Sequence, residues 1–272
     1  MKISASRIGF VGFGHMAQIL FRSIDLSKLI PRSQILFTRR DQGKMRKNEQ
    51  EFGITSASLE TVVAMSDLVF LCIRPQQADQ VLEHLAKIGV SGKRIVSILA
   101  GLKISYFEKK LEGAALIRAM PNLPAELGEG VTILSYGTRA DLEFCSLVKL
   151  FFQNMGLVVE LPEQQMDLAT GIAGSGPAYV FSLIEAAARL GESGGIPYEK
   201  ALKIAAQTFF GSAKVLLQDG VDVFQLIQTI IVPNGTTEAG MKTLKESEVE
   251  KRFAAVLNAA SLRSKEISEF SN

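Results

Sequence analysis

A glycine-rich turn near the amino end has the residue types and spacing of a phosphate-binding loop. The apolar run Ile8–Val11 meets Gly12-x-Gly14-x-x-Ala17, and an apolar-periodic segment follows. Gly12 permits a tight turn, Gly14 leaves room for a pyrophosphate beside the backbone, and Ala17 lets a helix lie close to the preceding strand. The free N–H groups that open this helix would face the phosphates. We interpret the turn as a dinucleotide site; an ordinary glycine-rich loop is the alternative.

The end of the next predicted strand indicates which dinucleotide binds. The segment Ile35-Leu-Phe-Thr-Arg-Arg40 carries no carboxylate at its tip, and instead ends in the hydroxyl of Thr38 and the guanidinium groups of Arg39 and Arg40. A carboxylate would accept hydrogen bonds from a free ribose 2′-OH, whereas arginine binds a 2′-phosphate. We therefore predict NADPH as the cofactor, with NADH as the alternative. Two solvated surface arginines are the competing interpretation.

Composition excludes several other classes of site. The 272 residues contain two histidines, His15 and His84, and two cysteines, Cys72 and Cys145. Neither a zinc set, a disulfide framework nor a Ser-His-Asp triad is supported by so few, and we expect no metal. A net charge of +2 gives no electrostatic reason to expect nucleic acid or a membrane surface as partner. The short amino-terminal apolar run already belongs to the glycine turn, so we expect no signal peptide and a cytoplasmic location.

The chain is unusually apolar for a protein in which no segment is a candidate to span a membrane. Hydrophobic residues make up 47% of it and the mean hydropathy is +0.20, yet no apolar run approaches the ~18 residues that cross a bilayer. The surplus suggests extra buried surface, most simply a subunit interface.

Short β-like runs alternate with helical patterns over the first 160 residues. Strands are predicted at 8–12, 34–38, 68–73, 94–99, 115–120, 131–135 and 157–160. Helices are predicted at 16–24, 40–51, 58–64, 78–86, 104–111 and 141–152. This order predicts an α/β fold, a Rossmann-type doubly wound sheet with right-handed crossovers.

The pattern changes after Pro162. Three long Ala/Leu-rich segments, 179–190, 198–218 and 249–267, predict an all-helical region. The segment 178–190 is apolar on most faces, which is typical of a helix buried within a domain or between subunits. We therefore expect a cofactor domain at 1–160 and a helical dimerisation domain at 161–272.

Further segments fall where such a sheet places its ligand loops, and one lies between helices. They are Ile73-Arg-Pro-Gln76, Ser97-Ile-Leu-Ala-Gly101, Arg118-Ala-Met-Pro-Asn-Leu-Pro124, Gly171-Ile-Ala-Gly-Ser-Gly-Pro-Ala-Tyr179 and Val232-Pro-Asn-Gly-Thr-Thr-Glu-Ala-Gly240. In this order they resemble the motifs of the pyrroline-5-carboxylate reductase family, which read roughly V-K-P, S-x-x-A-G, R-x-M-P-N-T-P, S-G-S-G-P-A-Y and S-P-G-G-T-T. The resemblance runs from Ile8 to the segment 263–267, nearly the whole chain.

The resemblance implies reduction of 1-pyrroline-5-carboxylate to proline, by hydride transfer from the nicotinamide to a cyclic imine. Thr237 matches the threonine that hydrogen-bonds the ring nitrogen, and is the implied catalytic residue. The implied substrate-binding residues are Asn234, Gly235, Thr236, Thr237 and Ser175. The expected cofactor-binding residues are Gly12, Gly14, His15, Met16, Ala17, Thr38, Arg39, Arg40, Arg74, Pro75, Ala100, Gly101, Pro121 and Asn122. The resemblance also implies an intertwined homodimer through the helical domain, with a higher ring of dimers known in the family.

Local structural roles remain alternatives for several of these residues. Thr237 could be the N-cap of a helix that starts at Glu238, and Ser175 could be a cap as well. Asn122 could be a turn residue between two prolines, and Gly101 could simply end a strand.

The sequence departs from the family in the segments that hold substrate. Arg74 replaces a lysine, Leu123 a threonine and Ala173 a serine; Ile231 occupies a place that is ordinarily polar. Val232 replaces a serine and Asn234 a glycine. Loss of the hydroxyl at 232 predicts weaker carboxylate binding or a substrate with a different tail.

These departures motivate two alternatives. A non-catalytic NADP-binding regulator would keep the fold without turnover. A β-hydroxyacid dehydrogenase would need a lysine in the first long carboxy-terminal helix, where Tyr179–Glu192 contains only Arg189.

Overall fold

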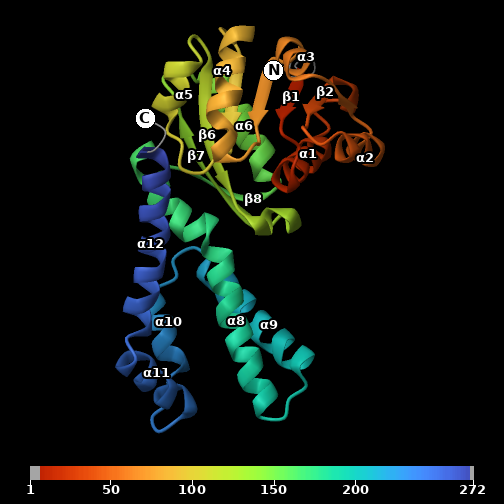
Figure 1. The fold of residues 1–272 in the computed structure, drawn as a ribbon. Coiled ribbons are helices and arrows are strands. Elements are labelled where there is room, and N and C mark those ends of the chain that lie inside the picture. The colour runs from red at the N-terminus through yellow and green to blue at the C-terminus, as the bar shows by residue number, and fades with distance from the viewer. Residues whose placement is uncertain (1–6, 270–272) are drawn as a thin grey trace. The chain divides into compact units, whose positions relative to one another are not determined.

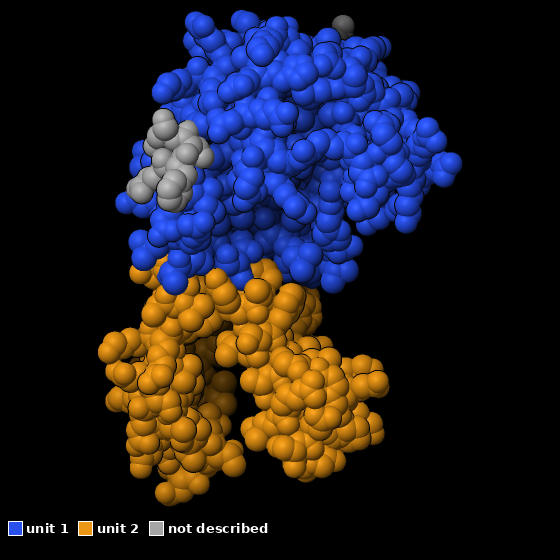
Figure 2. All heavy atoms as spheres, in the orientation of Figure 1, with its two compact units in different colours: residues 1–175, 259–272 blue, residues 176–258 orange. Residues whose placement is uncertain are grey.

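The computed structural model describes residues 7–269, and these fall into two compact units. Unit 1 comprises residues 1–175 and 259–272, and unit 2 comprises residues 176–258 (Figure 2). The last helix begins in unit 2 and ends in unit 1. The division into two domains that was expected at residue 160 stays a prediction.

A single sheet forms the centre of unit 1 (Figure 1). Its strand order is β3-β2-β1-β4-β5-β6-β7-β8, and all neighbours are parallel except β6 and β7. The strands are β1 (Ile8–Val11), β2 (Ile35–Thr38), β3 (Thr55–Ser56), β4 (Leu68–Leu71), β5 (Arg94–Ser97), β6 (Ala115–Pro121), β7 (Gly130–Tyr136) and β8 (Gly156–Glu160). The predicted fold class is thereby confirmed.

Helices cover both faces of this sheet. One core joins α1, α2 and α6 to the side chains of Phe10, Phe37 and Phe70, and the other joins α4 and α5 to Val69 and Leu71. The helices of unit 1 are α1 (His15–Ser27), α2 (Gln42–Phe52), α3 (Leu59–Met65), α4 (Ala78–Ile88), α5 (Ile104–Lys110), α6 (Leu142–Gln153) and α7 (Met166–Ala169). Short 3₁₀ turns lie at Arg32–Gln34, Pro75–Gln77, Leu123–Leu127 and Glu163–Gln165.

The sequence pattern did not predict three features of unit 1. Strand β3 has only two residues, too few to show a period. A 3₁₀ turn rather than a long helix joins β6 to β7, and the two strands consequently run antiparallel. After β8, α7 continues into a π-helical turn at Thr170–Gly174, which ends at Ser175.

Unit 2 consists of helices. They are α8 (Gly176–Ser193), α9 (Tyr198–Leu216), α10 (Val223–Ile230), α11 (Thr236–Glu246) and the first part of α12 (Val249–Glu269). Helices α8 and α9 form a hairpin, in which Tyr198 donates a hydrogen bond to Glu185. A Cβ at Gly191 would lie 2.8 Å from that of Ala201, so glycine allows the two helices to pack closely. None of the described helices is both long and apolar enough to traverse a bilayer.

Candidate cofactor cleft and substrate loop

A cleft of about 780 Å³ opens at the carboxyl ends of the central strands of unit 1. Strand β1 lies between β2 and β4, so the strand order reverses direction at β1. Open α/β sheets bind ligands at such a switch point. The glycine turn, the end of β2 and the ends of β4 to β6 all contribute to the lining.

The glycine turn has the geometry that phosphate binding requires. Gly12 has φ = +88°, and a Cβ there would lie 2.6 Å from the carbonyl oxygen of Cys72, so a larger residue would be strained and would clash. Gly14 is the N-cap of α1, and no atom lies within 4 Å of its would-be Cβ. The first N–H groups of α1 have no intrahelical partner, which leaves them available to an anion in the open space.

The two arginines after β2 lie in different surroundings. Arg39 donates from Nη1 to the carbonyl oxygen of Phe13 at 2.8 Å, so it braces the residue between the two motif glycines. The guanidinium of Arg40 makes no hydrogen bond or ion pair with any described residue. Both side chains line the cleft, together with Thr38. Of these two arginines, Arg40 is therefore the one whose guanidinium is left free for a ligand phosphate.

One face of α4 forms a wall of the cleft that the sequence analysis missed. Gln77, Gln80, Val81 and His84 line it at helical spacing, opposite Leu59 of α3. The imidazole Nε2 of His84 lies 2.6 Å from Glu60 Oε1. The signal was present as an i, i+3, i+4, i+7 set in the helix that follows a ligand loop.

The opposite end of the cleft is formed by the ends of β5 and β6. Ile98, Met120 and Pro121 line it. A Cβ at Gly174 would lie 2.5 Å from Met120 Cε, so the π-helical turn packs directly behind this end. Gly174 thus borders the cleft through Met120.

Cys72 is among the residues that line the cleft, but its surroundings do not favour the thiolate form of its side chain. Desolvation raises the pKa of this thiol well above its usual range. Since the thiolate is the reactive form, Cys72 fills space rather than reacting.

Most of the expected cofactor residues come together in the cleft. Those that line it are Gly12, Gly14, His15, Met16, Ala17, Thr38, Arg39, Arg40, Arg74 and Pro121. Pro75, Ala100, Gly101 and Asn122 are not among the lining residues. Pro75 begins the 3₁₀ turn beside Arg74.

Asn122 has a structural role in this fold. Its Nδ2 donates to the carbonyl oxygen of Ala173 at 3.1 Å, and its Oδ1 accepts from the N–H of Val131 at 2.9 Å. The side chain is buried and joins the end of β6 to β7 and to the π-helical turn. Both ends of the amide are therefore occupied by protein.

The loop expected to bind substrate lies in unit 2 and opens α11. The helix begins at Thr236 with Gly235 as its N-cap, so the alternative that Thr237 caps it is wrong. The hydroxyls of both threonines make no hydrogen bond with described residues. They are thus free to contact a ligand.

Two backbone N–H groups of this loop already donate hydrogen bonds within the loop and to α11. The Asn234 N–H, at a residue with φ = +59°, donates to Glu238 Oε2 at 2.8 Å, and the Gly235 N–H donates to the carbonyl oxygen of Val232 at 2.9 Å. The N–H groups of Thr236 and Thr237, in the first turn of α11, are the ones left for an external anion. The side chain of Val232 is 62% exposed.

Ser175, also expected at the substrate, ends the π-helical turn in unit 1. Its N–H donates to the carbonyl oxygen of Thr170 at 3.0 Å. Its hydroxyl makes no hydrogen bond with described residues.

Two family models match the chain. Residues 163–267 match the model described as pyrroline-5-carboxylate reductase dimerisation, and residues 7–101 match that described as NADP oxidoreductase, coenzyme F420-dependent. The pyrroline-5-carboxylate reductase of Arabidopsis thaliana is 33% identical over 97% of this chain and 96% of its own length.

Solved structures agree over the same span. The pyrroline-5-carboxylate reductase of Coxiella burnetii superposes with a TM-score of 0.87 at 30% identity, covering 97% of this chain and 99% of that one. The pyrroline carboxylate reductase of Plasmodium falciparum, solved with NADP bound, gives 0.88 at 26% identity, with the same coverage.

Proposed function

The chain belongs to the pyrroline-5-carboxylate reductase family, and from this premise we propose that it reduces 1-pyrroline-5-carboxylate to proline with NADPH. The observation that carries the proposal is the cleft of unit 1. A motif glycine with open space beside it and an uncommitted arginine line the same cavity. The glycine turn and Arg40 at one part of the cavity are suited to phosphates, and the side chains of Ile98 and Met120 make another part apolar.

The residues present fit NADPH. A volume of about 780 Å³ lies within the range of small-molecule sites. The N–H groups after Gly14 suit the pyrophosphate, Arg40 suits the 2′-phosphate, and the apolar end at Ile98 and Met120 suits the nicotinamide. When bound there, the cofactor supplies the hydride. Arg74 and Pro75 border the same site.

The residues of the substrate loop would bind and orient the imine. The Thr237 hydroxyl can hold a proton at the ring nitrogen, and the N–H groups of Thr236 and Thr237 can receive the substrate carboxylate. A protonated imine accepts hydride without a strong acid beside it, so orientation and exclusion of water are the protein's main tasks. We also propose Asn234, Gly235 and Ser175 as substrate-binding residues.

Unit 2 supports a homodimer as the working form. Its match to a dimerisation model and its many exposed apolar side chains are consistent with an interface there. We further propose a ring of dimers and a cytoplasmic location. We also propose a division between the two domains near residue 160, which is supported by the start of the dimerisation match at residue 163.

Steady-state kinetics test the proposal. Oxidation of NADPH and of NADH is followed at 340 nm with five- and six-membered cyclic imino acids. We expect turnover with 1-pyrroline-5-carboxylate and a higher kcat/KM for NADPH. Cofactor binding without turnover of any cyclic imine would overturn the reductase and leave the regulator.

A further inference from the structure

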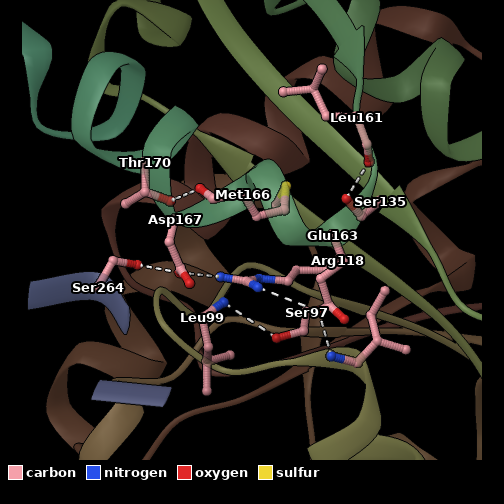
Figure 3. Close-up of polar contacts among 11 residues, drawn as sticks. Ser97, Leu99, Arg118, Ser135, Leu161, Glu163, Met166, Asp167, Thr170 and Ser264 are labelled. Atoms are coloured by element: carbon pink, nitrogen blue, oxygen red, sulfur yellow. Dashed lines mark hydrogen bonds and ion pairs between the residues drawn. The ribbon is translucent and has the colours of Figure 1, made fainter. Parts of the chain in front are cut away.

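A buried ionic cluster lies beside the apolar end of the cleft, and the proposed reaction gives it no direct role. Arg118 of β6 is 2% exposed. Its Nη1 lies 3.3 Å from Glu163 Oε1 and its Nη2 lies 3.5 Å from Asp167 Oδ1. Asp167 Oδ1 also accepts from the hydroxyl of Ser264 at 2.7 Å. Figure 3 shows the guanidinium between the two carboxylates, with Ser264 on the other side of Asp167.

The cluster joins segments that are distant in sequence but belong to one compact unit. Arg118 comes from β6, the carboxylates from the segment before and within α7, and Ser264 from the carboxyl part of α12. Burying one cation with two anions is costly unless each makes good hydrogen bonds. A buried ion cluster is therefore weak evidence for added stability. Here it fixes how these segments pack against one another and against a loop of the cleft.

That loop, residues 98–103, follows β5. Contacts with Ser97 hold its first end, and a hydrogen bond to Glu163 holds its second end. Ser97 pairs in register with Arg118 across β5 and β6, and the Ser97 hydroxyl accepts from the N–H of Leu99 at 3.3 Å. At the other end, the N–H of Ile104 donates to Glu163 Oε1 at 2.6 Å, the same oxygen that faces Arg118. The carboxylate thus fixes where the loop enters α5.

The middle of the loop rests on α12. Gly101 has φ = +77°, and a Cβ there would lie 2.6 Å from Ile267 Cγ2 and 3.0 Å from the carbonyl oxygen of Ser264. Glycine is therefore needed both for the turn and for the close approach of the helix. Because Ser264 bonds to Asp167, the cluster holds the helix turn against which Gly101 packs.

We propose that Arg118, Asp167 and Ser264 are positioning residues that fix the loop 98–103, and through Ile98 the apolar end of the cleft, in the arrangement that binds the nicotinamide. The inference rests on the proposed function for the identity of that ligand. In this arrangement Gly101 packs against α12 and affects the cleft through Ile98, which lines it.

The first test compares binding of the whole cofactor with binding of a cofactor fragment. Ser264→Ala removes one hydrogen bond and no charge; Ser261→Ala, on the same helix and without a side-chain hydrogen bond to described residues, is the matched control. Calorimetry gives Kd for NADPH and for 2′-phospho-ADP-ribose, which lacks the nicotinamide. We expect Ser264→Ala to weaken NADPH binding roughly three- to tenfold, the range of such indirect couplings, with fragment binding and the control unchanged.

Hydrogen exchange of the cofactor-free protein gives a second readout, independent of activity. In Ser264→Ala the amides of residues 98–104 should exchange faster than in the wild type and in Ser261→Ala, while those of the glycine turn should not. Arg118→Lys keeps a charge but loses the two-pronged contact, and should change the same amides. If Arg118→Lys does not fold, Ser264→Ala alone decides.

Equal loss of affinity for NADPH and the fragment, or unchanged exchange at residues 98–104, would overturn the positioning role. Failure of the proposed function gives a different result. A wild-type protein that binds the fragment but gains nothing from the nicotinamide, and reduces no cyclic imine, would contradict the reductase, while the exchange comparison would still report on the cluster.

Discussion

Two neighbouring arginines of the same type have different roles in the cleft. Arg39 is bonded to the Phe13 carbonyl, inside the glycine turn, whereas the Arg40 guanidinium makes no hydrogen bond or ion pair with described residues. A guanidinium that is hydrogen-bonded to the backbone of the glycine turn would contribute equally to the binding of NADPH and NADH. A guanidinium without such a bond can distinguish the two cofactors by binding the 2′-phosphate. The preference that we propose for NADPH therefore depends chiefly on Arg40.

Arg40→Ala should raise KM for NADPH by about ten- to a hundredfold, since a hydrogen bond to a charged group contributes about 1.5–3 kcal/mol. KM for NADH should change little. Arg39→Ala should raise KM for both cofactors, because it loosens the turn that both use. Parallel kinetics with the two cofactors measure this, and an equal effect of Arg40→Ala on both would contradict the assignment.

The substrate loop carries an anion of its own. Glu238 accepts from the Asn234 N–H at 2.8 Å, at the helix end where an incoming carboxylate would bind. A negative charge there opposes a second one, and Val232 offers no hydroxyl to offset it. The loop as folded is therefore less favourable to a carboxylate than its threonines alone suggest.

Glu238→Gln keeps an oxygen for the Asn234 N–H and removes the charge. We expect KM for 1-pyrroline-5-carboxylate to fall about two- to fivefold, the size of a helix-terminus charge effect, with no change for 1-pyrroline, which has no carboxylate. Val232→Ser should act in the same direction. Glu246→Gln, at the other end of α11, is the control. Unchanged KM in both loop variants would remove this loop from the substrate site.

At the scale of elements, capping residues set where several helices of unit 1 begin. Asp41, Ser58 and Asp141 each accept a hydrogen bond from the first turn of α2, α3 and α6. The Phe144 N–H and, to a lesser degree, Arg94 hold the pKa of the Asp141 carboxyl below its usual range. A lowered pKa means that folding favours the ionised form.

Asp141→Ala should lower the free energy of unfolding by about 1 kcal/mol near neutral pH. The loss should shrink as the pH falls below about 4, the pKa of an aspartate in an unfolded chain, because protonation first of the unfolded chain and then of the cap itself removes the stability that the ionised cap contributes. Urea titrations at several pH values measure this. Asp141→Asn, which caps without titrating, should keep the stability at all these values. A loss for Asp141→Ala that is independent of pH would contradict the ionised cap.

At the scale of the whole molecule, the two units differ in how much apolar surface they leave uncovered. In α8 only Gly176 and Ala188 are buried, although the helix is apolar on most faces. Leu183 and Leu190, seven residues apart and on one face of that helix, are 42% and 75% exposed. Exposed apolar surface of this extent is typical of a protein interface, which agrees with the dimerisation match.

Leu183→Asp and Leu190→Asp should shift the protein from dimer toward monomer, because each would bury a carboxylate in the interface. Leu142→Asp, in unit 1 at a residue that is 87% exposed, should leave the dimer intact. Analytical ultracentrifugation over a range of concentrations distinguishes these outcomes. A dimer unaffected by both α8 variants would place the interface elsewhere.

Local sequence was sufficient for the order of elements and for most of the cleft. The glycine turn, the arginines after β2 and the predicted strands depend on neighbouring residues and on short periods, and these are legible along the chain. The antiparallel β7 and the two-residue β3 depended on pairing with distant segments. The helical spacing of the α4 wall was present in the sequence, but only the fold shows that this face lines the cleft. Element boundaries moved by a few residues, since caps such as Asp41 lie outside the apolar pattern.

What the sequence determined by itself was therefore the sheet, its phosphate-binding turn and the family. Only the tertiary structure separated Arg39 from Arg40 and showed that both ends of the Asn122 amide bond to protein. It also brought Arg118, Asp167 and Ser264 together behind the loop 98–103. Period and composition report on neighbours in the chain, whereas hydrogen-bond partners that lie tens of residues apart are chosen by packing.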